Sequence, residues 1–119
     1  MLKLLIVDDE VDIREFAKRF FSKRSINVFT ADGGRGALSI VETEKPDLIL
    51  LDVNMGDMDG IETLKILREK GDQTKVMMVT GVEDEAIVNE LKDLGIAGIV
   101  HKPLILEELE QIVMKELNG

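Results

Sequence analysis

The sequence contains no cysteine, no tryptophan, no tyrosine and only one histidine. The lack of cysteine excludes disulfides, thiolate zinc sites, iron–sulfur clusters and cysteine nucleophiles, and a single histidine excludes any metal site that needs two. No apolar run approaches the roughly 20 residues that a membrane helix requires. The short apolar start is followed directly by acids, which is typical of a first strand and not of a signal peptide. We therefore expect a soluble, cytoplasmic protein without membrane contact.

Positive charge is also scarce in the chain. It has 15 Lys and Arg residues against 24 Asp and Glu residues, which gives a net charge of −9. This charge has the wrong sign for binding a phosphate backbone, so we expect no direct contact with nucleic acid. With 45% hydrophobic residues in 119 positions, the chain has the size and composition of one globular domain, which we expect to span residues 1–119.

Five short apolar runs predict β-strands at residues 4–7, 27–30, 47–51, 76–79 and 97–100. Most of these runs are continuous in Leu, Ile, Val and Met, which is typical of strands buried on both faces in a parallel sheet. Segments of helical period lie between them; Ile13, Phe16, Ala17 and Phe20, for example, share one helical face. The alternation predicts a (βα)5 doubly wound α/β fold, with a five-stranded parallel sheet and helices on both faces.

Polar residues follow the predicted strands at their carboxyl ends. Asp8 and Asp9 come after the first strand, Asp52 after the third, Thr80 after the fourth and Lys102 after the fifth. The carboxyl ends of parallel strands share one edge of the sheet, and such folds bind ligands there. We therefore expect three carboxylates, a hydroxyl and an ammonium group to converge at this edge.

Each of these acids also has a structural interpretation. Asp8, Asp9 and Asp12 could cap the following helix or favour its first turn, and Asp52 could belong to a turn because its surroundings are rich in Gly, Asn and Asp. Capping and turn formation do not explain why several acids would lie together at one edge. Two carboxylates about 4 Å apart repel by roughly 4 kcal/mol at an effective dielectric constant of about 20. A bound divalent cation removes that cost.

The residue types in the group indicate phosphate chemistry. Oxygen ligands with open water positions favour Mg²⁺, which is commonly held by one or two carboxylates and a substrate phosphate. A carboxylate beside Mg²⁺ can attack phosphorus and form an acyl phosphate. Asp52 suits that role, Lys102 can neutralise charge on the phosphoryl oxygens, and Thr80 can donate a hydrogen bond to one of them.

Five motifs, in order along the chain, resemble the receiver domain of bacterial two-component response regulators. They are Asp8-Asp9-Glu10 with the apolar run before it, residues 46–55 around Asp52, Met58-Asp59-Gly60, Val79-Thr80-Gly81 and His101-Lys102-Pro103. The resemblance covers residues from 4 to about 117. It implies a flavodoxin-like fold of the stand-alone, CheY-like type.

The resemblance implies a phosphorylation-controlled switch. Asp52 would accept a phosphoryl group from the phosphohistidine of a sensor histidine kinase or phosphotransfer protein. Lys102 would contact the phosphoryl oxygens, and Thr80 would turn toward them as the switch residue. The peptide between Lys102 and Pro103 would be cis. A downstream target protein would bind the surface of residues 84–117, whose shape changes on phosphorylation.

The resemblance also implies a magnesium site. Asp9 and Asp52 would ligate Mg²⁺ through their carboxylates, Asn54 through its backbone carbonyl and Asp8 through a water molecule. Magnesium is the one cofactor that we expect.

Three positions depart from the common pattern of the family. Gly56 stands where most receivers have proline, and Gly81 stands where alanine usually follows the switch threonine; both changes are expected to loosen their loops. Ile99 occupies the place that Tyr or Phe usually holds, so no aromatic ring can couple to Thr80 from there. These departures leave a second hypothesis open, a degenerate receiver that binds partners without phosphorylation.

A third hypothesis is an aspartyl-phosphate phosphatase similar to the haloacid dehalogenase superfamily. Members of that group carry a second aspartate two residues after the nucleophile, where this chain has Asn54, and 119 residues leave no room for a cap domain. We therefore expect a switch that catalyses only its own phosphorylation and dephosphorylation, and not an enzyme with a separate substrate.

Overall fold

Five parallel strands form one central sheet in the computed structural model, which describes residues 1–55, 58–81 and 85–118. The strands are β1 (Lys3–Val7), β2 (Asn27–Ala31), β3 (Leu48–Asp52), β4 (Lys75–Thr80) and β5 (Gly98–His101). Their order across the sheet is β2-β1-β3-β4-β5. This order confirms the predicted doubly wound fold and puts its switch point between β1 and β3.

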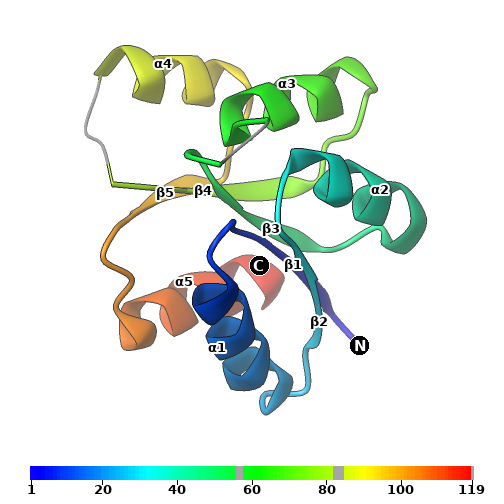
Figure 1. The fold of residues 1–119 in the computed structure, drawn as a ribbon, viewed down its shortest axis with the longest axis vertical. Helices are drawn as coiled ribbons and strands as arrows, with labels where there is room; N and C mark the ends of the chain where they lie inside the picture. Colours follow the sequence, from blue (N-terminus) through cyan, green and yellow to red (C-terminus); the bar gives the residue numbers. More distant parts are fainter. Residues whose placement is uncertain (56–57, 82–84, 119) are drawn as a thin grey trace.

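Helices cover both faces of the sheet (Figure 1). The helices α1 (Val11–Ser22) and α5 (Leu106–Asn118) lie on one face. The helices α2 (Gly34–Glu44), α3 (Gly60–Glu69) and α4 (Glu85–Asp93) lie on the other. None of the helices in the described part of the chain has the length and apolar run needed to cross a bilayer.

The predicted strand bounds were wrong by about one residue at several ends. β3, β4 and β5 continue onto Asp52, Thr80 and His101, which the prediction had placed after the strands. The backbone N–H of Val53 still donates to the carbonyl of Val79 at 2.9 Å beyond the end of β3. Backbone pairing does not depend on the side chain, so a polar residue can end the strand without breaking the ladder.

The helix α2 begins at Gly34 and has a second glycine, Gly36, in its first turn. Gly34 is buried, and a Cβ atom at this position would lie 2.3 Å from Thr63 Oγ1 and 2.7 Å from Met58 Sδ. The glycine therefore allows the first turn of α2 to approach α3 closely, which is a packing requirement that propensity alone does not reveal.

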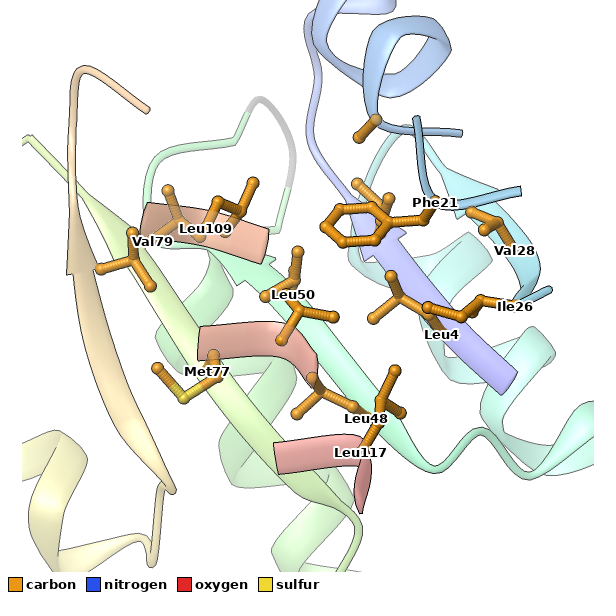
Figure 2. Packing of buried hydrophobic residues seen from close by; sticks show 14 residues of the cluster. Leu4, Phe21, Ile26, Val28, Leu48, Leu50, Met77, Val79, Leu109 and Leu117 are labelled. Atoms are coloured by element: carbon orange, nitrogen blue, oxygen red, sulfur yellow. The ribbon is translucent and has the colours of Figure 1, made fainter. Parts of the chain in front are cut away.

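The core consists of two apolar layers, one on each face of the sheet. Leu4 and Ile6 of β1 point into the layer under α1 and α5, whereas Leu5 and Val7 point into the opposite layer. Figure 2 shows the first layer, in which Phe21 of α1 lies beside the side chains of β1. Both faces of the central strands are buried, which explains why their sequences are continuously apolar.

The start of α3 is packed against the backbone at the end of β3. The side chain of Asp59 caps the helix by accepting a hydrogen bond from the N–H of Glu62 at 2.8 Å. The N–H of Gly60 donates to the carbonyl of Val53 at 2.9 Å. A Cβ atom on Gly60 would lie only 2.2 Å from the carbonyl oxygen of Asp52. A side chain at position 60 would therefore have to displace the backbone of Asp52.

Replacing Gly60 with alanine should destabilise the protein by about 1–3 kcal/mol, because the added methyl group forces backbone atoms apart. Gly36→Ala is the matched control. Its Cβ would lie 3.5 Å from the Cβ of Ala31, an ordinary contact, on an exposed part of α2. This control should be neutral or stabilising by up to about 1 kcal/mol. Chemical denaturation measures both free energies of unfolding, and equal effects of the two substitutions would contradict the packing argument.

Candidate functional site

The carboxyl edge of the sheet brings Asp8, Asp52 and Lys102 together. Val7 pairs with Leu51 in the β1–β3 register, so Asp8 and Asp52 follow on neighbouring strands at the same level. The backbone N–H of Lys102 donates to the carbonyl of Thr80 at 2.9 Å, which extends the β4–β5 ladder by one residue. From this position Lys102 Nζ reaches Asp52 Oδ2 at 3.0 Å.

Asp52 is a buried carboxylate whose two oxygens both accept hydrogen bonds. Its side chain is 1% exposed. Oδ2 accepts from Lys102, and Oδ1 accepts from the backbone N–H of Asn54 at 3.1 Å. The second bond is of the kind that aspartate makes in turns, so the turn interpretation was right about local geometry. It does not account for the burial or for the ammonium partner.

Asp8 is a second buried carboxylate beside Asp52. Its Oδ1 accepts from the N–H of Glu10 at 2.9 Å, and its carbonyl accepts from Arg14 Nη1 at 2.7 Å. Burial raises the pKa of Asp8, and the negative charges of Asp52 and Glu10 raise it further, while the Glu10 hydrogen bond and Lys102 oppose the change. Asp8 is therefore a carboxyl group that burial makes harder to ionise and that Lys102 helps to keep charged.

Asp9 and Glu10 add exposed carboxylates next to Asp8. One carboxylate oxygen from each of these three residues can be chosen so that all lie within 4.8 Å of one another. The capping interpretation of Asp8 and Asp9 is wrong, because the N-cap residue of α1 is Glu10, and it makes no side-chain cap bond. Asp12 does lie in the first helical turn, where an acid is favourable.

Lys102 is held in its charged form by the acids around it. Partial burial alone would lower the pKa of Lys102, but the hydrogen bond and charge of Asp52, together with Asp8 and Glu10, outweigh burial and raise it. The site therefore has a fixed cation on one side and a set of oxygen donors on the other. Such a set can bind a hard divalent cation and a phosphoryl group together.

Thr80 and the residues around it line the neighbouring part of the edge. Thr80 is 2% exposed and ends β4. The peptide between Lys102 and Pro103 is cis, as the resemblance predicted. A Cβ atom on Gly81 would lie 3.9 Å from Lys102 Cβ, so an alanine would fit where the sequence has glycine. Gly56 and Asp84, the first residue of the predicted 84–117 surface, lie outside the described residues.

Ile99 lies on β5 opposite Met78, in the position where the family usually has an aromatic residue. Its side chain is partly buried and packs against the apolar layer under α2, α3 and α4. An aliphatic side chain therefore fills this position and packs against the core on the face that carries α4.

An apolar groove beside the site was not predicted from the sequence. Helical periodicity placed Phe16 with the core residues of its helix, but Phe16 is 56% exposed, and Ala17 and Phe21 are the buried residues of α1. The groove has a volume of about 450 Å³ and is lined by Asp12, Ile13, Phe16, Ala17, Lys102, Pro103, Leu104, Leu106 and Leu109. A stripe of apolar residues does not indicate which of its members lie at the edge of the buried face.

Known proteins match this chain in sequence and in structure. The family model of the response regulator receiver domain matches residues 4–114. Sporulation initiation phosphotransferase F of Bacillus subtilis is 37% identical over 115 residues, which cover 97% of this chain and 93% of that protein. Regulatory protein AtoC of Escherichia coli is 34% identical over 98% of this chain, which spans only 25% of AtoC.

A solved structure agrees with these matches. The chemotaxis protein CheY4 of Vibrio cholerae superposes with a TM-score of 0.90 at 32% identity, and the alignment covers 98% of this chain and 99% of that one. The resemblance that the five motifs carried is thereby confirmed. The chain belongs to the response regulator receiver domains, the signalling domains of two-component systems.

Proposed function

We propose that the chain is a phosphorylation-controlled switch whose phosphoacceptor is Asp52. The observation that carries the proposal is the buried Asp52 carboxylate, 1% exposed and bonded to Lys102 at 3.0 Å, beside the acids that follow β1. A carboxylate so placed can act as a nucleophile, with a cation beside it to receive the charge of the phosphoryl oxygens.

The phosphodonor would be the phosphohistidine of a sensor kinase or phosphotransfer protein. One Asp52 oxygen forms the new O–P bond while the P–N bond of phosphohistidine breaks, and its electron pair leaves with the imidazole nitrogen. Lys102 neutralises part of the charge on the transferred group, and the Thr80 hydroxyl can donate a hydrogen bond to it. The product replaces a carboxylate by a group with roughly −2 charge and additional acceptor oxygens.

The residues at the site fit Mg²⁺. The candidate ligand atoms are all oxygens, and one carboxylate oxygen each from Asp8, Asp9 and Glu10 lie within 4.8 Å of one another. Asp9 and Asp52 would hold the ion through carboxylates, Asn54 through its carbonyl and Asp8 through water. When bound, the ion supplies neutralisation of the phosphoryl oxygens and fixes their position.

The same edge offers a place for the phosphodonor protein to dock. Val11, Phe16 and Ile105 are each more than half exposed, and the apolar groove between α1 and the β5–α5 loop extends to Lys102. An amphipathic helix with apolar residues for the groove fits this surface.

The signal would then leave through a change in the surface of residues 84–117, where a target protein binds. An aspartyl-phosphate phosphatase is disfavoured, because receiver domains are in general signalling domains and not classical enzymes. The degenerate receiver stays open as the second candidate, since Ile99 replaces the usual aromatic residue.

Acetyl phosphate with Mg²⁺ should add about 80 Da to the intact protein, as expected for one phosphoryl group. Asp52→Asn should abolish the addition, because an amide is not a nucleophile toward phosphorus, whereas Asp12→Asn on the exposed start of α1 should retain it. Intact-protein mass spectrometry measures both. Labelling of Asp52→Asn to the level of the wild-type chain would refute the assignment, and an unlabelled wild-type chain would favour the degenerate receiver.

Removal of Mg²⁺ by EDTA should abolish labelling by acetyl phosphate. It should also lower the melting temperature of the protein relative to that measured with Mg²⁺, because a bound ion stabilises the folded state. Asp9→Asn should shift the Mg²⁺ concentration for half-maximal labelling upward by about tenfold or more, since one anionic ligand is lost. Asp47→Asn, which lies at the opposite end of β3, should leave that concentration unchanged. Labelling at full rate in EDTA would contradict the metal site.

Phe16→Ser should slow phosphoryl transfer from a protein donor much more than transfer from acetyl phosphate. Truncating a central apolar anchor costs about 2 kcal/mol or more of binding, or more than about tenfold. The protein donor is chosen from the autophosphorylated histidine kinases encoded in the same genome as this chain. It is the kinase that transfers its phosphoryl group to the wild-type chain fastest. Phe29→Ser, on β2 away from the groove, is the control. Equal slowing with both donors would assign Phe16 to folding and not to docking.

A further inference from the structure

The position of α4 depends on few apolar contacts. Leu91 is the one fully buried apolar side chain among the described residues of α4, whereas α3 buries two, Leu64 and Leu67; the other described α4 side chains are exposed or half-buried. Ile87 and Leu94 add partial packing against the layer beneath. A helix held in this way can shift on the sheet at small cost, so the polar contacts along its side have a large share in fixing its position.

Those polar contacts come from α3, which lies beside α4 on the same face of the sheet (Figure 1). Arg68, near the end of α3, donates to the carbonyl of Leu94 through Nε at 2.8 Å and to that of Gly95 through Nη2 at 3.1 Å. The same guanidinium donates to the carbonyls of Asp72 and Thr74, so it joins the turn after α4 to the loop after α3. One turn earlier, Lys65 Nζ lies 2.6 Å from Glu90 Oε1 of α4.

The opposite end of α3 is fixed to the candidate phosphorylation site. The hydrogen bond from Gly60 to Val53 and the close approach of Gly60 to the Asp52 carbonyl leave no space between the helix and the backbone of Asp52. A backbone shift at Asp52 therefore has to move the start of α3. The ten residues of this helix then extend about 15 Å to the residues that hold α4.

We propose that α3 transmits phosphorylation of Asp52 to α4, with Arg68 and the Lys65–Glu90 pair as its contacts to that helix. The inference rests on the proposed function, because it takes Asp52 as the phosphoacceptor. It also gives a route for the signal in a chain that has Ile99 on β5, where no aromatic ring is present that could turn on phosphorylation. Arg68 and Lys65 are thus positioning residues that act on the output surface through α4.

The test uses beryllofluoride with Mg²⁺ as a stand-in for the phosphoryl group and hydrogen–deuterium exchange of residues 85–95 as the readout. In the wild-type chain the ligand should change exchange in this segment. In Lys65→Gln and in Arg68→Gln that change should fall by about twofold or more, because the contacts between α3 and α4 are cut. Lys65→Arg keeps the cation and should restore the response.

Lys75→Gln is the matched control, since Lys75 forms an ion pair of similar exposure with Glu116 on the other face. It should leave the response of residues 85–95 unchanged. A full response in Lys65→Gln and Arg68→Gln, an equal loss in Lys75→Gln, or no response in a wild-type chain that binds beryllofluoride would each overturn the proposal. The exposed Lys65–Glu90 pair keeps the test valid if Arg68→Gln does not fold.

The same samples separate this inference from the proposed function. Labelling of each variant by acetyl phosphate should persist, because neither Arg68 nor Lys65 contacts Asp52. If the wild-type chain is not labelled, the assignment of Asp52 fails. If the variants Lys65→Gln and Arg68→Gln are still labelled and their hydrogen exchange in α4 still responds fully to beryllofluoride, only the proposed coupling through α3 fails. The affinity for beryllofluoride provides a second readout. Coupling between two sites is reciprocal, so a substitution that weakens the effect of beryllofluoride on α4 should also change the affinity of the variant for beryllofluoride.

Discussion

The ion pair between Lys102 and Asp52 is the interaction on which the rest of the site depends. It joins the ends of β3 and β5, two strands that are separated in the sheet by β4. Burying the Asp52 carboxylate without a partner would be costly, and the ammonium group at 3.0 Å offsets that cost. Asp8 is buried beside this pair, and burial raises its pKa, while Lys102 acts in the opposite direction.

Close backbone packing gives the same site a mechanical connection to the surface. Gly60 allows α3 to begin in contact with the Asp52 carbonyl, and Arg68 and Lys65 join the helix to α4. Chemistry at a buried carboxylate and the position of a surface helix are thereby linked through one rigid element. Packed interiors deform little, so a small displacement at one end of such a helix is carried to the other.

The apolar groove beside Lys102 is lined by residues of α1 and α5, which lie on the same face of the sheet (Figure 1). Its lining combines apolar side chains of α1 and α5 with one acid, Asp12, and one base, Lys102. The groove therefore offers a partner protein apolar contact area more than charge.

The sequence by itself determined the architecture and which polar strand ends share one edge of the sheet. Continuous apolar runs require strands buried on both faces, and this requirement leads to a parallel sheet whose polar strand ends meet at one edge. Asp8, Asp52 and Lys102 were identified on this ground, and the register of β1, β3 and β4 brings them together. The five motifs added the family, which the similarity to known receivers then confirmed.

Only the tertiary structure decided which apolar residues are exposed and which polar residues bond to a different element of the fold. Periodicity could not show that Phe16 is exposed while Phe21 is buried, because both lie near the edge of one helical stripe. Nothing in the spacing of Arg68 signals its bonds to Leu94 and Gly95, since these partners lie on another helix–strand connection. Local patterns record how one element meets the core, whereas contacts between elements depend on how the whole sheet stacks them.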